Sequence, residues 1–234
     1  MISVFKKEFS GYFFSSFGFV FIGIFLLISG ITFSTYNLIG MRGDMNGMFG
    51  IFSNISIMTF PILTMKLFSE ERRLGTEQLL LTSKLKCWQI VVGKYLAALS
   101  LFLIALMGTI IYVGIIKTYG NPNLGSIVGS YTGFILLGSA FIAMSMFASS
   151  IFENQITSAI GSFGILFISV IIGSLGKSLQ IPILKDVLSF LSVTTKYESI
   201  TRGILTLEPI VYYIFFSIFF VFLTTKTLEK RKLD

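Results

Sequence analysis

The fold is decided by residues 12–36, which read Y-F-F-S-S-F-G-F-V-F-I-G-I-F-L-L-I-S-G-I-T-F-S-T-Y. This stretch carries no charged side chain, and it exceeds the about 20 apolar residues that a helix needs to cross a bilayer. The apolar core of a secretory signal peptide has only about 7–15 residues, and no small-residue cleavage site follows here. The stretch therefore predicts a retained membrane-spanning helix.

The composition of the whole chain points to the same environment. Of its 234 residues, 54% are hydrophobic and only 12% are charged. Soluble domains contain about 25% charged residues. A chain so poor in charge cannot cover an apolar core with polar side chains, so we expect lipid to be its solvent.

Five more apolar runs follow the first one. Together they predict six spans, at about residues 12–36, 48–68, 89–116, 127–151, 156–176 and 208–225. Residues 1–11 instead mix apolar and charged side chains, a pattern typical of a helix that lies at the membrane surface. We therefore expect an all-α integral membrane protein, with residues 1–234 forming a single transmembrane domain.

The Lys and Arg residues are distributed unequally between the two sides of these spans. One side contains both termini, the 69–88 connection with its flanks and the 152–155 turn; it holds twelve of the 18 Lys and Arg residues, against six on the other side. The twelve are Lys6, Lys7, Lys66, Arg72, Arg73, Lys84, Lys86, Lys94, Lys226, Lys230, Arg231 and Lys232. The positive-inside rule places this side in the cytoplasm. The net charge of +7 then reflects basic residues that orient the spans in the membrane, and we expect no nucleic-acid partner.

Several kinds of chemistry lack the residues they need. The chain has no His and one cysteine, Cys87, which excludes an internal disulfide and a multi-cysteine metal site. No Asp or Glu lies near the middle of a predicted span, and such carboxylates commonly mark proton pathways. A membrane-embedded enzyme would need catalytic groups at a membrane face, where Glu153 is the best candidate. Its position in the tight turn between spans four and five favours a topology cap over a catalytic role.

Three glycines at intervals of four residues begin the fourth span. Gly125, Gly129 and Gly133 form two overlapping G-x-x-x-G steps, which let helices approach closely in lipid. The spacing favours packing within the chain and leaves open a seam between two copies.

The connection between the second and third spans is the most informative segment. Residues 69–88 read S-E-E-R-R-L-G-T-E-Q-L-L-L-T-S-K-L-K-C-W. Thr76 suits the N-cap of a short helix, and Glu77 suits the positive end of that helix. Such a helix would present apolar residues to a partner protein. A solvated loop whose charges fix the topology is the alternative, and these physical arguments leave both open.

Two blocks of this sequence resemble a known family. Residues 70–83, E-E-R-R-L-G-T-E-Q-L-L-L-T-S, and 88–97, W-Q-I-V-V-G-K-Y-L-A, are similar to the signature of ABC-2 type permeases. The branch with the gliding-motility permease and the copper-maturation permease of nitrous oxide reductase matches best. Residues 197–213, Y-E-S-I-T-R-G-I-L-T-L-E-P-I-V-Y-Y, resemble the closing block of that branch. The sequence departs from the commoner pattern at Lys84, where Pro often stands.

The resemblance implies a fold with six spans, an N-terminal interfacial helix and a cytoplasmic coupling helix between spans two and three. It implies short non-spanning helices at 181–206. The coupling helix would dock on a separate ABC-type ATPase. By position, the coupling residues are Glu70, Glu71, Arg72, Arg73, Gly75, Thr76 and Glu77.

The resemblance also implies an assembly. Two ATPase subunits would bind ATP and Mg²⁺, and a second permease, either the same chain or a relative, would complete an exporter in the bacterial cytoplasmic membrane. The chain itself would bind no cofactor and would be a transport subunit, not an enzyme. A membrane anchor or assembly scaffold without translocation is the alternative function.

Overall fold

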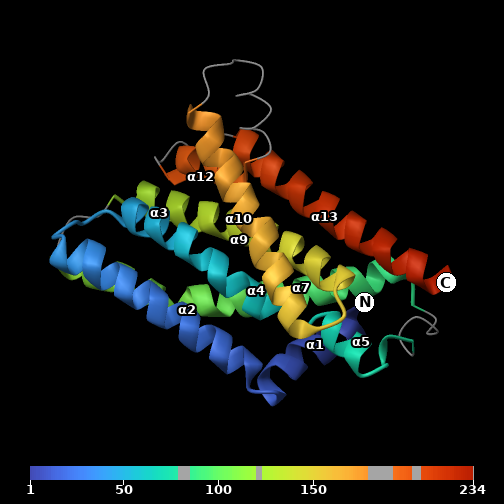
Figure 1. The fold of residues 1–234 in the computed structure, drawn as a ribbon. Coiled ribbons are helices and arrows are strands. Elements are labelled where there is room, and N and C mark those ends of the chain that lie inside the picture. The colour runs from blue at the N-terminus through green and yellow to red at the C-terminus, as the bar shows by residue number, and fades with distance from the viewer. Residues whose placement is uncertain (79–84, 120–122, 179–191, 202–206, 234) are drawn as a thin grey trace.

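A computed structural model describes residues 1–78, 85–119, 123–178, 192–201 and 207–233 of the chain (Figure 1). The regular structure of these residues is helical throughout, which confirms the predicted all-α fold. A helix satisfies its own backbone hydrogen bonds, as the interior of a bilayer requires. The elements are α1 Ile2–Phe14, α2 Phe17–Phe33, η1 Ser34–Ile39, α3 Met45–Ile55, η2 Ser56–Met58, α4 Thr59–Thr64, α5 Ser69–Arg73, α7 Cys87–Gly108, α8 Ile110–Tyr119, α9 Leu124–Ile151, α10 Gln155–Ser178, α12 Val193–Thr201 and α13 Leu207–Leu233.

The described residues include six helical stretches that are long and apolar enough to cross a membrane, as predicted. They are Phe17–Ile39, Met45–Arg73, Cys87–Thr118, Leu124–Ile151, Gln155–Gly173 and Leu207–Lys232. The second stretch is broken into α3, η2, α4 and α5, and the third bends at Thr109 between α7 and α8. The basic residues after 225 continue helix α13 to Leu233. Most of the predicted outer segment, 181–206, lies outside the described residues; only α12 and Ser192 are seen.

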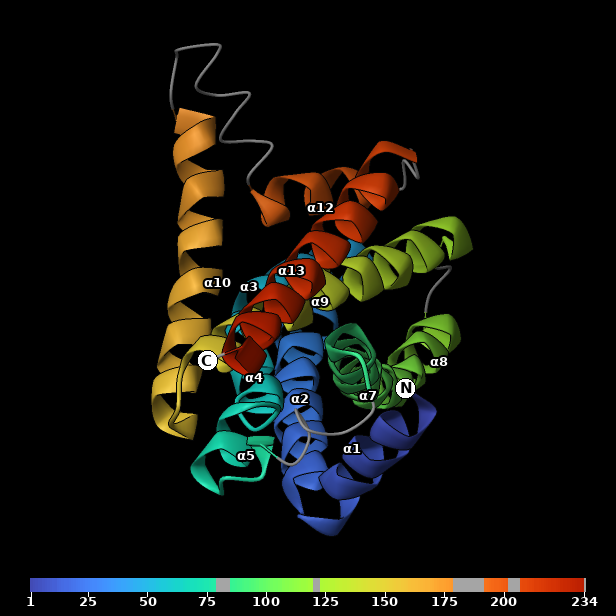
Figure 2. The same ribbon diagram turned by 90° about the vertical axis from the view of Figure 1, so that its right-hand side faces the viewer.

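Helix α9 lies at the centre of the bundle (Figures 1 and 2). It contacts α3, α4, α7, α10, α12 and α13. Of its span, 72% is buried inside the protein, compared with 28% for α10 and for α13. Many of its buried residues are Gly, Ala or Ser, and small residues let neighbouring helices approach closely in lipid.

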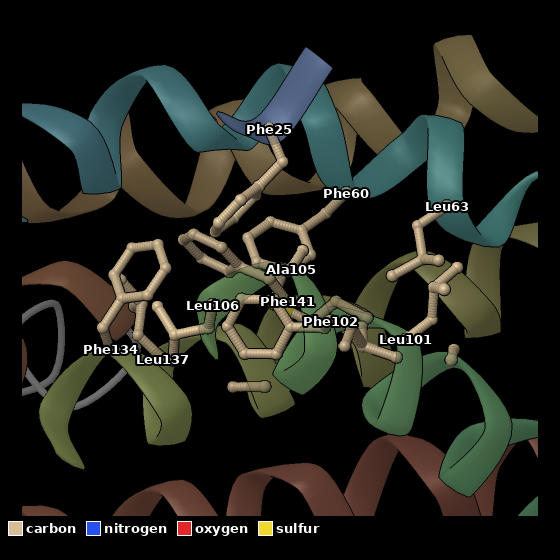
Figure 3. Close-up of a cluster of buried hydrophobic side chains, with 14 of the residues drawn as sticks. Phe25, Phe60, Leu63, Leu101, Phe102, Ala105, Leu106, Phe134, Leu137 and Phe141 are labelled. Atoms are coloured by element: carbon tan, nitrogen blue, oxygen red, sulfur yellow. The ribbon is translucent and has the colours of Figure 1, made fainter. Parts of the chain in front are cut away.

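Aromatic rings fill the space between α9 and its neighbours (Figure 3). The ring of Phe102 on α7 lies 5.9 Å from that of Phe25 on α2 and 5.8 Å from that of Phe134 on α9. Phe60 on α4 lies 5.3 Å from the same Phe102 ring. Edge-to-face and tilted ring pairs at these distances add to the stabilisation from burial. The cluster therefore joins four spans at the middle of the bundle.

Gly138 of α9 makes room for this cluster. A Cβ atom added at Gly138 would lie 2.5 Å from two ring atoms of Phe102. The Phe102 ring is itself fully buried among other rings, so it cannot move aside cheaply.

We predict opposite effects for two glycine substitutions. Gly138→Ala should lower the stability of the detergent-purified chain by about 1–3 kcal/mol, because it overpacks the core. Gly164→Ala in α10 is the matched control, since a Cβ there meets nothing within 4 Å. The control should be neutral or stabilising by up to about 1 kcal/mol, the difference in helix propensity between Gly and Ala. Thermal unfolding measures both, and equal melting temperatures for the two variants would contradict the packing at Gly138.

Both termini lie at the α5 end of the bundle (Figure 1). Near the N-terminus, Tyr12 of α1 donates a hydrogen bond from its hydroxyl to the carbonyl oxygen of Leu63, at 2.9 Å. Near the C-terminus, Arg231 of α13 reaches Glu77, just after α5, at 3.4 Å. The turn at residues 40–44 lies at the other end, because α2 with η1 and α3 with α4 each run the length of the bundle.

Candidate functional site

The connection after the second span begins with the short helix α5 and a sharp turn. Gly75 has a φ of +69°, a left-handed conformation that glycine adopts without steric cost. The Thr76 hydroxyl donates a hydrogen bond to the carbonyl oxygen of Glu71 at 3.3 Å, closing the turn over the end of α5. The helix predicted to start after Thr76 falls mostly on residues 79–84, outside the described part of the chain. The turn of residues 73–76, called the 73–76 turn below, is therefore the described tip of this connection.

A buried lysine of α7 holds this connection in place. The Lys94 side chain is fully buried, with its Nζ 2.8 Å from Glu71 Oε2 and 3.0 Å from Glu8 Oε1. It also donates a hydrogen bond to the carbonyl oxygen of Leu67. Glu71 belongs to α5 and Glu8 to α1, so one ammonium group joins three helices. We call Lys7, Glu8, Glu71 and Lys94 the Lys94 cluster.

The charges of the Lys94 cluster balance. Lys7 supplies the second cation, with its Nζ 2.9 Å from Glu71 Oε1. Burial disfavours the charged form of Lys7, but the hydrogen bond and charge of Glu71, together with Glu8, outweigh burial and raise the pKa of Lys7. Two ammonium groups thus face two carboxylates. A buried ion pair persists only when its members are neutralised and hydrogen-bonded in this way.

The sequence next to Lys94 lets α1 approach α7 closely. A Cβ atom added at Gly93 would lie 3.0 Å from the Cβ of Val4 on α1. The absence of a side chain at Gly93 thus allows Glu8, one turn further along α1, to reach Lys94.

Two arginines attach the same connection to the end of α9. Arg72 donates from Nη1 to the carbonyl oxygen of Ile151 at 3.0 Å and from Nη2 to that of Ser150 at 2.8 Å. Arg231 of α13 donates to the Ile151 carbonyl at 3.3 Å. Glu77 lies between the arginines, 3.3 Å from Arg72 Nε and 3.4 Å from Arg231 Nη1. Cations are favourable at a helix C-terminus, where carbonyl groups lack partners within the helix.

The seven residues predicted to contact an ATPase therefore divide into two groups. Glu71, Arg72 and Glu77 are engaged in contacts within the chain, and Glu70 pairs with Lys66 at 3.5 Å. Arg73, Gly75 and Thr76 are exposed, as is the intervening Leu74, at 62%. The 73–76 turn is thus the described part of this segment that is open to a partner.

The three predicted packing glycines also differ from one another. Gly125 is exposed at the start of α9, whereas Gly129 and Gly133 are buried. A Cβ added at Gly133 would lie 2.9 Å from Ile200 Cγ2 of α12. The structure thus places Gly133 against another helix of the same chain.

Sequence reasoning did not identify the role of Lys94, Glu8, Lys7 or Arg231. The three cations, Lys7, Lys94 and Arg231, were interpreted only as residues that set the orientation of the spans in the membrane. The available signal was the position of Lys94, inside the predicted 89–116 span, because an ionisable residue within a span normally has a partner. Among the described residues, no group of three or more His, Cys, Asp and Glu residues could hold a metal ion.

Comparison with known proteins decides the family. A profile described as ABC-2 family transporter protein matches residues 51–227, which include α5 and all or most of each span after the first. The chain belongs to the ABC-2 transporter family.

The chain is also similar to two curated ABC transporter permeases. It is 26% identical over 151 residues to the probable multidrug ABC transporter permease YbhR of Escherichia coli strain K12, and equally so to that of Escherichia coli O157:H7. The match covers 64% of this chain but only 40% of each relative. Family membership, with the six apolar stretches, makes this a multi-pass membrane protein of the permease type.

The Lys94 cluster predicts different effects for two neighbouring glutamates of this ABC-2 chain. Glu71→Gln should lower stability by about 2–3 kcal/mol, because it unbalances a buried ion cluster. Glu70→Gln is the matched control; the Glu70 side chain is 31% exposed in its pair with Lys66, and its loss should cost under about 1 kcal/mol. Unfolding of the purified chain in detergent measures both. Equal losses would mean that the Lys94 cluster stabilises no more than a surface ion pair.

Proposed function

We propose that this chain is the membrane-spanning permease subunit of an exporter that is driven by a separate ABC-type ATPase. The main observation behind the proposal is that contacts within the chain fix the residues around the 73–76 turn. Ion pairs and charged hydrogen bonds attach the segment around it to α1, α7, α9 and α13. A connection that only links two spans needs no such attachment. A surface that transmits a conformational change from a partner protein does need such attachment. A flexible loop would move without displacing the helices.

The charge distribution supports an orientation for the proposed subunit. Lys7, Lys66, Arg73 and Lys230 all lie at the α5 end, near the two termini. By the positive-inside rule, this end faces the cytoplasm, where ATP is available. We place the chain in the bacterial cytoplasmic membrane with both termini inside.

The assembly that we propose contains two ATPase subunits and two permeases. The ATPases bind the ATP and Mg²⁺, and the second permease is a copy of this chain or a relative. The description of the YbhR relatives as probable multidrug transporter permeases supports export as the direction. The sequence blocks at 70–83 and 197–213 support placement in the branch of the gliding-motility and copper-maturation permeases.

The proposal predicts that the exposed 73–76 turn makes the ATPase contact, and not Glu71, Arg72 and Glu77, which are engaged within the chain. Arg73→Glu combined with Leu74→Asp should weaken co-purification with the cognate ABC-type ATPase by about tenfold or more, as loss of a central interface residue does. The melting temperature of the permease alone should stay unchanged, because both side chains are exposed. Co-expression with the ABC-type ATPases of the source genome, followed by pull-down and ATP turnover, measures the effect.

The matched control is Lys230→Glu, a charge reversal at another exposed position of the same end. It should leave the complex intact. Full retention of the ATPase by the Arg73→Glu, Leu74→Asp variant would refute the assigned contact. A chain that binds the ATPase without changing its turnover would be an anchor instead of a transporter.

A further inference from the structure

The end of the bundle opposite α5 contains a cavity of about 660 Å³. It lies between the turn that joins η1 to α3 and the helix α8. Its lining residues are Asn37, Leu38, Met41, Arg42, Gly43, Ile115 and Ile116. The volume falls in the range of ligand pockets, about 300–1,000 Å³, and an apolar wall with few polar groups is typical of such pockets.

The backbone around this cavity has an unusual conformation. Residues 34–39 form a π-helix, which in proteins is frequently found at functional sites. Met41 has a φ of +49°, which is uncommon for a residue other than glycine. The Asn37 side chain stabilises this turn by donating from Nδ2 to the carbonyl oxygens of Arg42 at 2.8 Å and Asp44 at 3.0 Å.

Arg42 brings a positive charge that forms no ion pair with a carboxylate of the described residues, although Asp44 lies near enough to interact with it. In the described part of the chain, its guanidinium donates a hydrogen bond to the Tyr36 hydroxyl at 3.1 Å and has no carboxylate within 4.0 Å. The Asp44 carboxylate is engaged elsewhere, because it accepts from the Tyr36 hydroxyl at 3.0 Å and from the Gly47 amide at 3.3 Å. A guanidinium has five N–H donors. Most of those on Arg42 remain available, and the planar guanidinium can donate two of them to two oxygens of a phosphate group.

A buried acceptor lies beside this charge. Asn37 is 5% exposed and lines the cavity, and its Oδ1 accepts no hydrogen bond from the described residues. Leaving a buried acceptor unpaired is costly. Less than 1 Å² of this oxygen is exposed, so it is not open to a ligand in this conformation.

We propose that this cavity binds an anionic bilayer lipid. The lipid phosphate pairs with the Arg42 guanidinium, and an acyl chain lies along Leu38, Ile115 and Ile116. The position of the turn supports this occupant, because residues 40–44 join two spans and so lie at the depth of the lipid headgroups. The apolar wall favours a lipid over a free phosphate. The site is independent of the ATPase contact proposed above.

The test compares three probes on the purified full chain in a neutral detergent. Native mass spectrometry should show that the first phosphatidylglycerol binds at least about tenfold more tightly than phosphatidylcholine. Glycerol 1-phosphate, which has the headgroup chemistry without acyl chains, should not bind at the same concentrations. Arg42→Gln should remove the preference for phosphatidylglycerol, and Arg42→Lys should retain part of it. Lys117→Gln, which removes an exposed cation of α8 outside the cavity lining, should have no effect.

A further variant tests the apolar wall with Arg42 intact. Ile115→Trp narrows the cavity and should weaken phosphatidylglycerol binding about fivefold or more. Equal binding of the two phospholipids to the wild type would overturn the proposal. It would also be overturned if Lys117→Gln lost the preference for phosphatidylglycerol as completely as Arg42→Gln. Tight binding of glycerol 1-phosphate would show a free-anion site instead. None of these measurements involves an ATPase, so failure here leaves the proposed function standing.

Discussion

The arrangement of one end of this protein depends on the burial of a single ammonium group, that of Lys94. Removing a charge from water costs several kcal/mol unless partners of opposite charge and hydrogen bonds replace the water. Lys94 obtains these partners from Glu8, Glu71 and the Leu67 carbonyl. Helix α1 must therefore lie against α7, and the chain after the second span must return to the same point. The N-terminal helix and the connection between spans two and three are consequently parts of one rigid body.

This body is joined directly to the centre of the bundle. Arg72 and Arg231 bind the last carbonyl groups of α9, and α9 is the span that contacts most of the others. A force applied to the 73–76 turn would therefore reach α9 through Arg72 and α7 through Lys94. The close packing along α9, as at Gly138 against Phe102, leaves little free space to absorb such a movement. Displacement at the turn should thus be passed on to whole helices.

The sequence predicted the spans well because lipid imposes a simple rule on them. Most of the run 12–36 has to be helical, since a bilayer offers its backbone no other hydrogen-bond partners. The predicted start was too early, because α1 ends at Phe14, Ser16 has a φ of +57° and the span begins at Phe17. Long-range pairs follow no comparable rule. Lys94 and Glu8 are separated by 86 positions, and only the folded packing of α1 on α7 brings them together. Thr76 was predicted to begin a new helix, but the sequence did not indicate that Glu71 and Arg72 on one side and Glu77 on the other would bind inside the chain.

The two ends of the bundle use charge differently, and the difference follows from how each turn is held. At the α5 end, ion pairs hold the connection, so Glu71, Arg72 and Glu77 are engaged and the surface left to a partner is the 73–76 turn. At the other end, neutral amide hydrogen bonds from Asn37 hold the 40–44 turn. Arg42 contacts the ring and hydroxyl of Tyr36 but forms no ion pair among the described residues, and it lines a cavity with aliphatic walls. The 73–76 turn, fixed by ion pairs outside the membrane, suits contact with a protein partner. Arg42, beside an apolar cavity at the depth of the lipid headgroups, suits contact with a lipid.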